Sequence, residues 1–219
     1  KKLLDNCEVD KASVGLVIYA SNGVFDFHMY SPAAKISAEF GFDNAYAFEL
    51  NNGCNAGVMA IHTAQSLLQT QNYDYALIVM SDTLSKLIDY RQQAAFPFFI
   101  CGDGATAVLL EKNSRYYAIE STALLTNGAY VDCCRLAQSG IDHINQTGRV
   151  NASQCVIFDS LDVTTQRVVS EEIYQGYVKV MQAALEQAYL SVKDINFWLI
   201  NQNSKKIVDR VFTHFQVAE

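Results

Sequence analysis

Short apolar runs alternate with helical patterns along the chain. The apolar run at 14–20 is bounded by polar residues and predicts a buried strand of a parallel sheet. Similar apolar runs predict further strands at 46–50, 74–82, 106–111 and 195–200. Apolar residues at helical spacing predict helices at 33–40, 55–71, 165–189 and 205–215. Pro32 opens the first of these helices and Gly41 closes it. This alternation is typical of an α/β fold.

The same pattern divides the chain into three parts. Residues 1–112 form a first α/β half. Residues 113–164 are polar, turn-rich and irregular, with strand-like pieces at 116–119 and 155–158, so we expect an excursion that covers the site. Residues 165–219 begin a second half. The chain opens without Met inside a helical pattern and stops just after another helix, so we expect both ends to be incomplete.

Two segments of the chain repeat one pattern. Residues 9–20 align without gaps on residues 190–201, and in both a helix ends, a short polar loop turns and an apolar strand begins at the same place. A repeat of this size predicts a duplicated α/β unit. Because sites in parallel α/β layers form at the carboxyl ends of strands, the repeat places Asn201 at a strand end that faces such a site.

Composition narrows the functional classes. Half of the residues are hydrophobic and 18% are charged, which permits a sizeable core. The net charge of −7, without a stripe of Lys and Arg, argues against a nucleic-acid partner. No apolar run is long enough to span a membrane. The cysteines show no metal-ligand spacing with the four histidines, which predicts reduced thiols in a cytoplasmic protein without a metal. They are Cys7, Cys54, Cys101, Cys133, Cys134 and Cys155.

One cysteine occupies a special corner. The apolar run 45–50 stops at a polar, glycine-flanked stretch, and Cys54 lies there between Gly53 and Gly57, where a helical pattern starts. A helix N-terminus stabilises a thiolate, so this is a place for a nucleophile. A buried cysteine in a tight strand–helix turn is an equally good interpretation of the same residues.

Four motifs occur in a fixed order and spacing. They are FELNNGCNAG at 48–57, ALIVMSD at 76–82, GDGA at 102–105 and WLINQNS at 198–204. GDGA lacks the lysine of a P-loop and the spacing of a dinucleotide loop, so it is interpreted as a turn beside the site. Together the motifs resemble β-ketoacyl-acyl carrier protein synthase III, a family of the thiolase-like superfamily.

The resemblance implies a fold and a reaction. The fold is a thiolase-like αβαβα layered fold, usually in a homodimer. Cys54 takes an acyl group from the thioester of acyl-CoA or acyl carrier protein, and malonyl carrier protein then decarboxylates to a carbanion that attacks the acyl-enzyme. No cofactor beyond these substrates is implied. Phe25 and Phe27 fall where the family places acyl-pocket and dimer-contact residues, with ordinary packing as the alternative, and Gly102 is the third expected substrate-binding residue.

The chain departs from the family pattern at Asn201. The family has a histidine in a His-Gln-x-Asn motif, and this register gives Asn-Gln-Asn-Ser here. An amide can donate a hydrogen bond to an oxyanion, but it cannot exchange a proton near neutral pH. We therefore expect an acyltransferase with slow condensation. The alternatives are acyl transfer to an oxygen or nitrogen nucleophile, and a non-catalytic subunit paired with an active partner in a heterodimer.

Overall fold

The protein is described by a computed structural model that covers residues 2–217, with gaps at 24, 28, 89, 92–98, 100, 138–154, 159–162 and 203. The chain separates into two units, which are described one at a time. The first unit comprises Lys1–Leu87 and Ile100–Ala118, and the second comprises Ile88–Phe99 and Ile119–Glu219. The three-part division into 1–112, 113–164 and 165–219 stays a prediction.

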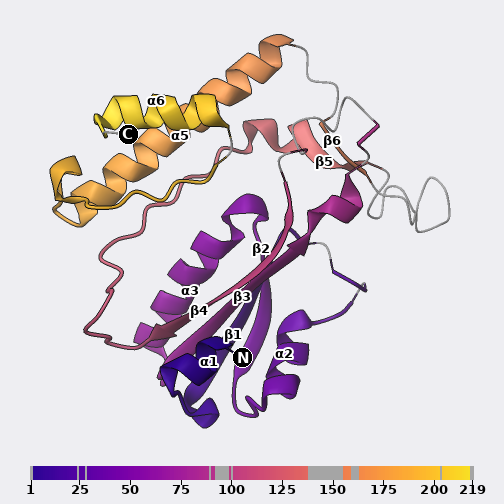
Figure 1. Ribbon diagram of the computed structural model, residues 1–219, viewed down its shortest axis with the longest axis vertical. Helices are drawn as coiled ribbons and strands as arrows, with labels where there is room; N and C mark the ends of the chain where they lie inside the picture. Colours follow the sequence, from indigo (N-terminus) through magenta and orange to yellow (C-terminus); the bar gives the residue numbers. More distant parts are fainter. Residues whose placement is uncertain are drawn as a thin grey trace. The chain divides into compact units, whose positions relative to one another are not determined.

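The first unit contains one sheet with helices on both faces (Figure 1). Its helices are α1 (Lys2–Cys7), α2 (Pro32–Phe40) and α3 (Ala56–Thr70), with short 3-10 turns η1 (Lys11–Ser13), η2 (Gly53–Asn55) and η3 (Leu84–Leu87). Its strands are β1 (Val14–Ser21), β2 (Tyr46–Asn51), β3 (Tyr75–Thr83) and β4 (Asp103–Glu111). The predicted strands and helices of this unit are therefore confirmed, within a few residues at their ends.

The strand order is β2-β1-β3-β4. β1 runs parallel to β2 and to β3, with Ile18 opposite both Phe48 and Ile78. The prediction that 14–20 is a strand of a parallel sheet is therefore confirmed, whereas β4 runs antiparallel to β3. The carboxyl ends of β1, β2 and β3 therefore lie at the same edge as the amino end of β4, and this edge is called the carboxyl edge below.

Small side chains let α3 approach the sheet closely. Ala56, Ala60 and Ala64 recur every fourth residue on α3 and are buried against one face of the sheet. In the first turn of α3, a Cβ atom added at Gly57 would lie 2.6 Å from Sδ of Met80 on β3. α1 and α2 pack on the other face, and Figure 1 shows α2 and α3 on opposite sides of the strands.

The start of α2 is attached to β2 by a carboxylate. Ser31 caps the helix by accepting a hydrogen bond from the backbone N–H of Ala34, and Gly41 ends it with φ of 73° in the left-handed region. Oε1 of Glu49 on β2 accepts hydrogen bonds from the Ser31 hydroxyl at 2.6 Å and from the Ala33 backbone N–H at 3.0 Å. The predicted proline-first, glycine-last helix is confirmed.

The second unit is built around two packed helices. Its elements are η5 (Gly128–Cys133), β5 (Cys134–Ala137), β6 (Cys155–Phe158), α5 (Val163–Gln187), η6 (Val192–Asp194) and α6 (Lys205–Phe215). Buried Val178 of α5 packs with Ile207, Val211 and Phe215 of α6. β5 pairs antiparallel with β6. The predicted helices are confirmed, as is the strand-like piece at 155–158, whereas 116–119 is not a strand.

The expected strand at 195–200 is also wrong. The segment is irregular, and exposed and partly buried side chains alternate only over 197–200. Trp198 stacks on Phe215 with ring centroids 5.9 Å apart, while Phe197 and Leu199 are 76% and 89% exposed. A strand needs a hydrogen-bonded neighbour as well as an apolar sequence. The structure pairs no strand with this segment among the residues that it describes.

The repeated segments fold alike up to the strand. η1 and η6 occupy equivalent positions in the alignment of 9–20 on 190–201, and each follows a helix. Asp10 caps η1 by accepting from the backbone N–H of Ala12 at 3.1 Å. In the second copy, Asp194 accepts from the backbone N–H of Ser191 at 2.8 Å. The helix and the turn are thus repeated, whereas only the first copy continues into a paired strand.

Gly15 of β1 tests how tightly the sheet is packed. A Cβ atom at this position would lie 2.9 Å from Cγ of Tyr73, so Gly15→Ala forces the ring to move. We expect the free energy of unfolding to fall by about 1–3 kcal/mol, as is typical of overpacking. Urea unfolding followed by circular dichroism measures it. Gly104→Ala on β4 is the control, because nothing lies within 4 Å of its Cβ. Equal midpoints for the two variants would contradict this packing.

Candidate active site

Cys54 lies in the short turn that joins β2 to α3. β2 ends at Asn51, η2 holds the thiol, and α3 begins at Ala56. Gly53 has φ of 55°, a left-handed conformation that favours glycine, so the corner depends on this residue. The Cys54 side chain is exposed, which argues against a buried structural cysteine. The turn therefore presents a solvent-accessible thiol at the start of α3, where the helix dipole favours negative charge.

Hydrogen bonds fix the neighbouring strand ends at the carboxyl edge. The Tyr19 hydroxyl of β1 donates to the backbone carbonyl of Ser81 on β3 at 2.7 Å. Just beyond β1, the backbone N–H of Asn22 donates to Oδ1 of Asp82 at 3.2 Å. Burial raises the pKa of the Tyr19 phenol, which keeps it protonated as a donor. These bonds hold the ends of β1 and β3 together beside the turn that carries Cys54.

A second thiol belongs to the same edge. Cys101 lies two residues before the start of β4 and is partly buried. Burial raises the pKa of the Cys101 thiol, and the negative charge of Cys54 raises it further. Sequence reasoning counted Cys101 only among six cysteines. Cys101 directly precedes the GDGA motif in the sequence. Because that motif was expected beside the site, this position could have indicated that Cys101 lies near Cys54.

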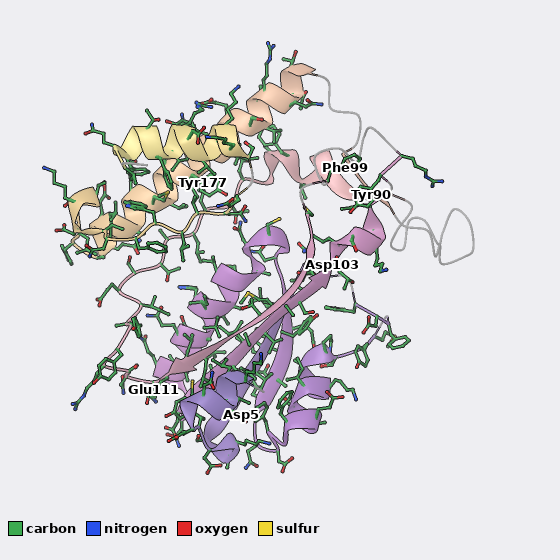
Figure 2. All side chains as sticks on the ribbon, in the orientation of Figure 1. Asp5, Tyr90, Phe99, Asp103, Glu111 and Tyr177 are labelled. Carbon is green, nitrogen blue, oxygen red and sulfur yellow. The ribbon has the colours of Figure 1, made fainter. Side chains whose placement is uncertain are left out.

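The GDGA motif differs from the turn that was predicted. Only Gly102 precedes β4, and the strand begins at Asp103. The Asp103 carboxylate accepts hydrogen bonds from the backbone N–H of Ser85 at 2.9 Å and from the Ser85 hydroxyl at 2.6 Å. These bonds lower the pKa of the Asp103 carboxyl. Figure 2 shows Asp103 and Glu111 at opposite ends of β4. The pair of hydrogen bonds between Ser85 and Asp103, called the Ser85–Asp103 clasp below, therefore lies at the carboxyl edge.

The expected substrate-binding residues all lie in the first unit. Phe25 packs edge-to-face on Tyr19 with ring centroids 6.1 Å apart. Phe27 is 67% exposed and contacts Tyr30 in the same geometry at 5.6 Å. Gly102 is exposed, with nothing within 4 Å of the position of a Cβ atom. The structure thus gives their surroundings, and their role toward a substrate stays a prediction.

Asn201 lies in the second unit, after the irregular segment that follows η6, and its side chain is exposed. Its backbone carbonyl accepts a hydrogen bond from the Tyr177 hydroxyl of α5 at 3.5 Å (Figure 2 labels Tyr177). This bond does not use the side-chain amide. The pairing of Asn201 with Cys54 stays a prediction, and Asn203 of the same motif lies outside the described residues.

The described part of the chain lacks two features, a cluster of metal ligands and a membrane-spanning helix. No group of three or more His, Cys, Asp or Glu side chains is placed there to hold a metal ion. None of the helices in these ranges is both long and apolar enough to cross a membrane.

Comparison with known proteins identifies the relatives of this site. A family model described as 3-oxoacyl-[acyl-carrier-protein (ACP)] synthase III matches residues 48–128, which include Cys54 and Gly102. β-Ketoacyl-[acyl-carrier-protein] synthase III of Lactococcus lactis is 26% identical over 212 residues, which are 96% of this chain and 62% of the relative. The enzyme of the same name from Streptococcus equi subsp. zooepidemicus is 28% identical over the same shares. The predicted resemblance to β-ketoacyl-acyl carrier protein synthase III is thereby confirmed.

Solved structures agree on the fold. The priming β-ketosynthase of the R1128 polyketide biosynthetic pathway superposes with a TM-score of 0.83 at 23% identity, covering 99% of this chain and 61% of that one. The synthase III of Thermus thermophilus gives 0.80 at 24% identity, with 99% and 63% covered. The predicted thiolase-like α/β fold is confirmed. The chain spans 62% of the length of the curated synthase III relatives reported above.

The Ser85–Asp103 clasp predicts a pH effect. Ser85→Ala removes the largest cause of the lowered Asp103 pKa, so this pKa should rise toward the ordinary aspartate value. A carboxyl whose pKa is lower in the folded state stabilises the fold above its unfolded-state pKa, and this contribution disappears as the pH falls through the folded-state pKa. In Ser85→Ala we therefore expect a smaller loss of stability over this acid range. Carboxyl carbon resonances followed during an NMR titration measure the pKa.

Asp194 is the internal control for this titration. Its pKa is lowered by Ser191 in the same way, and it belongs to the second unit. The Asp194 titration should be the same in both proteins. An Asp103 titration that is unchanged in Ser85→Ala would contradict the assignment of the clasp.

Proposed function

We propose that the protein is an acyltransferase of the synthase III type, which forms an acyl-cysteine at Cys54. The exposed thiol at the start of α3, inside the segment that the synthase III family model matches, carries this proposal. The donor is the thioester of acyl-CoA or of acyl carrier protein. The curated relatives support this donor class, because acyl carrier protein is part of their names.

In the first half-reaction, both the side chain and the backbone N–H of Cys54 take part. The Cys54 thiolate attacks the thioester carbonyl, which becomes a tetrahedral oxyanion. The backbone N–H of Cys54 at the start of the helix donates to this oxygen, because preformed donors stabilise charge that develops there. The carbonyl re-forms, the carbon–sulfur bond to the donor breaks, and the donor leaves as a thiolate. The acyl group is then bonded to Cys54.

The second half-reaction depends on what Asn201 does. In a condensation, malonyl carrier protein loses carbon dioxide and the resulting carbanion attacks the acyl-cysteine. The side-chain amide of Asn201 can donate a hydrogen bond to the thioester carbonyl as its oxygen gains charge. It cannot accept or supply a proton near neutral pH, so condensation is slow and acyl transfer to an oxygen or nitrogen nucleophile competes with it.

A non-catalytic subunit is the second candidate function. The observation that favours it is Asn201 at the position of the family's histidine. Under this alternative, the chain pairs with an active partner in a heterodimer. Under the preferred one, it works in fatty-acid or polyketide-like synthesis as a cytoplasmic homodimer, without a cofactor beyond its acyl donors.

Intact-mass spectrometry after incubation with acyl-CoA donors of several chain lengths tests the acyl-enzyme. We expect a mass gain of one acyl group in the native chain and in Cys7→Ser, and none in Cys54→Ser. Cys7 is a matched control, because it is also an exposed thiol of the first unit. The absence of an adduct with every acyl-CoA and acyl carrier protein donor would favour the non-catalytic subunit.

Asn201→His tests the cause of slow condensation. Histidine restores a group that can exchange protons, and such groups contribute about 10²–10⁴-fold to rates. We expect carbon dioxide release from malonyl carrier protein to rise at least about tenfold, near the lower part of this range. Asn196→His adds the same side chain at another exposed position of the same segment and should have no effect. Equal rates of carbon dioxide release for the two variants would contradict Asn201 as the cause of slow condensation.

A further inference from the structure

The carboxyl edge brings two cysteines together from distant parts of the sequence. Cys54 follows the end of β2, and Cys101 precedes the start of β4. In the sheet register, Ser21 of β1 lies opposite Asn51 at the end of β2, and Thr83 at the end of β3 lies opposite Asp103. Both thiols therefore lie at the same end of the four-stranded sheet.

The start of α3 carries Cys54 across the sheet toward β4. α3 contacts β1, β3 and β4 as well as β2. Gly57, in its first turn, faces Met80 of β3 at 2.6 Å, measured from a Cβ atom at Gly57 to Sδ of Met80. Met80 lies opposite Thr106 of β4. The first turn of α3, which follows Cys54, therefore lies over β3, the strand that pairs with β4.

The electrostatic link between the two thiols agrees with this geometry. The charge of Cys54 is one of the two causes that raise the pKa of Cys101, after burial. The interaction between two charges weakens as their separation grows. The pair is also asymmetric, because Cys54 is exposed whereas Cys101 is partly buried. A small oxidant from solvent therefore meets Cys54 first.

We propose that Cys54 and Cys101 form a reversible disulfide when a hydroperoxide oxidises Cys54, with Cys101 as the resolving thiol. The Cys54 thiolate attacks the peroxide, its sulfur gains one oxygen as a sulfenic acid, and the other peroxide oxygen leaves as water or an alcohol. The Cys101 thiolate then attacks the Cys54 sulfur. The sulfur–sulfur bond forms, the sulfur–oxygen bond breaks, and the oxygen leaves as water with the proton from Cys101.

The electrostatics favour this order of events. A sulfenic acid at Cys54 carries no thiolate charge, and that charge is one of the two causes that raise the pKa of Cys101. Oxidation of the first thiol thus makes ionisation of the second easier. The two thiols lose two electrons in total and the peroxide gains them. The disulfide protects Cys54 from irreversible oxidation, and a thiol reductant restores both cysteines.

The test reads thiol state and needs no acyl donor, so it is independent of the proposed acyltransferase function. The reduced full chain is freed of reductant, treated with hydrogen peroxide and digested without reduction. We expect mass spectrometry to find a peptide pair that joins Cys54 to Cys101, lighter by two hydrogens and lost on treatment with dithiothreitol. Cys101→Ser should lose the pair and accumulate Cys54 sulfenic acid, trapped with dimedone.

Cys7→Ser is the matched control, because Cys7 lies at the other end of the sheet. Its charge interacts with that of Tyr75, the first residue of β3. The Cys7→Ser variant should form the cross-linked pair as the native chain does. Dimedone labelling of Cys54 in the native chain equal to that in Cys101→Ser would overturn the proposal. So would a cross-link from Cys54 to any other cysteine. Because the native chain alone gives the cross-link result, the test does not depend on how well Cys101→Ser folds.

Discussion

The close approach of α3 to the sheet is the constraint on which the rest of the first unit depends. Alanines at every fourth position and Gly57 leave so little side chain on this face that the helix reaches β3 and β4. A larger residue there would hold the helix away from the strands. The same approach helps to set the position of the turn that carries Cys54 at the carboxyl edge. Core packing and the placement of Cys54 are therefore linked through the α3 sequence.

Polar contacts keep that edge in one arrangement. Glu49 joins β2 to the start of α2, Tyr19 joins β1 to β3, and the Ser85–Asp103 clasp holds the start of β4. Each joins segments that are distant in sequence, and each uses a side chain next to a strand end. Loops alone would leave these ends free to separate, since ordering them costs conformational entropy. The edge is thus a preorganised base for chemistry at Cys54.

Local patterns in the sequence predicted what local physics decides. The helix from Pro32 to Phe40 follows from its capping residue and its terminal glycine. The strands β1 and β3 follow from their apolar runs, and all of these signals occupy short stretches of the sequence. Strand pairing depends on partners elsewhere, so the antiparallel direction of β4 was not predicted and the strand expected at 195–200 was predicted wrongly. Cys54 was found because its corner is a local motif. Cys101 was missed as part of the site because its relation to Cys54 exists only after folding.

The chemistry of Cys54 differs from that of a nucleophile paired with histidine. An imidazole beside a thiol can hold the proton, pair with the thiolate and return the proton later. The side-chain amide of an asparagine such as Asn201 does none of these. Cys101, a second thiol, interacts with the charge of Cys54 instead. A helix N-terminus is enough to favour a thiolate and hence attack on a thioester. It supplies no proton for the steps that follow, so the proposed acylation of Cys54 is a separate property from turnover.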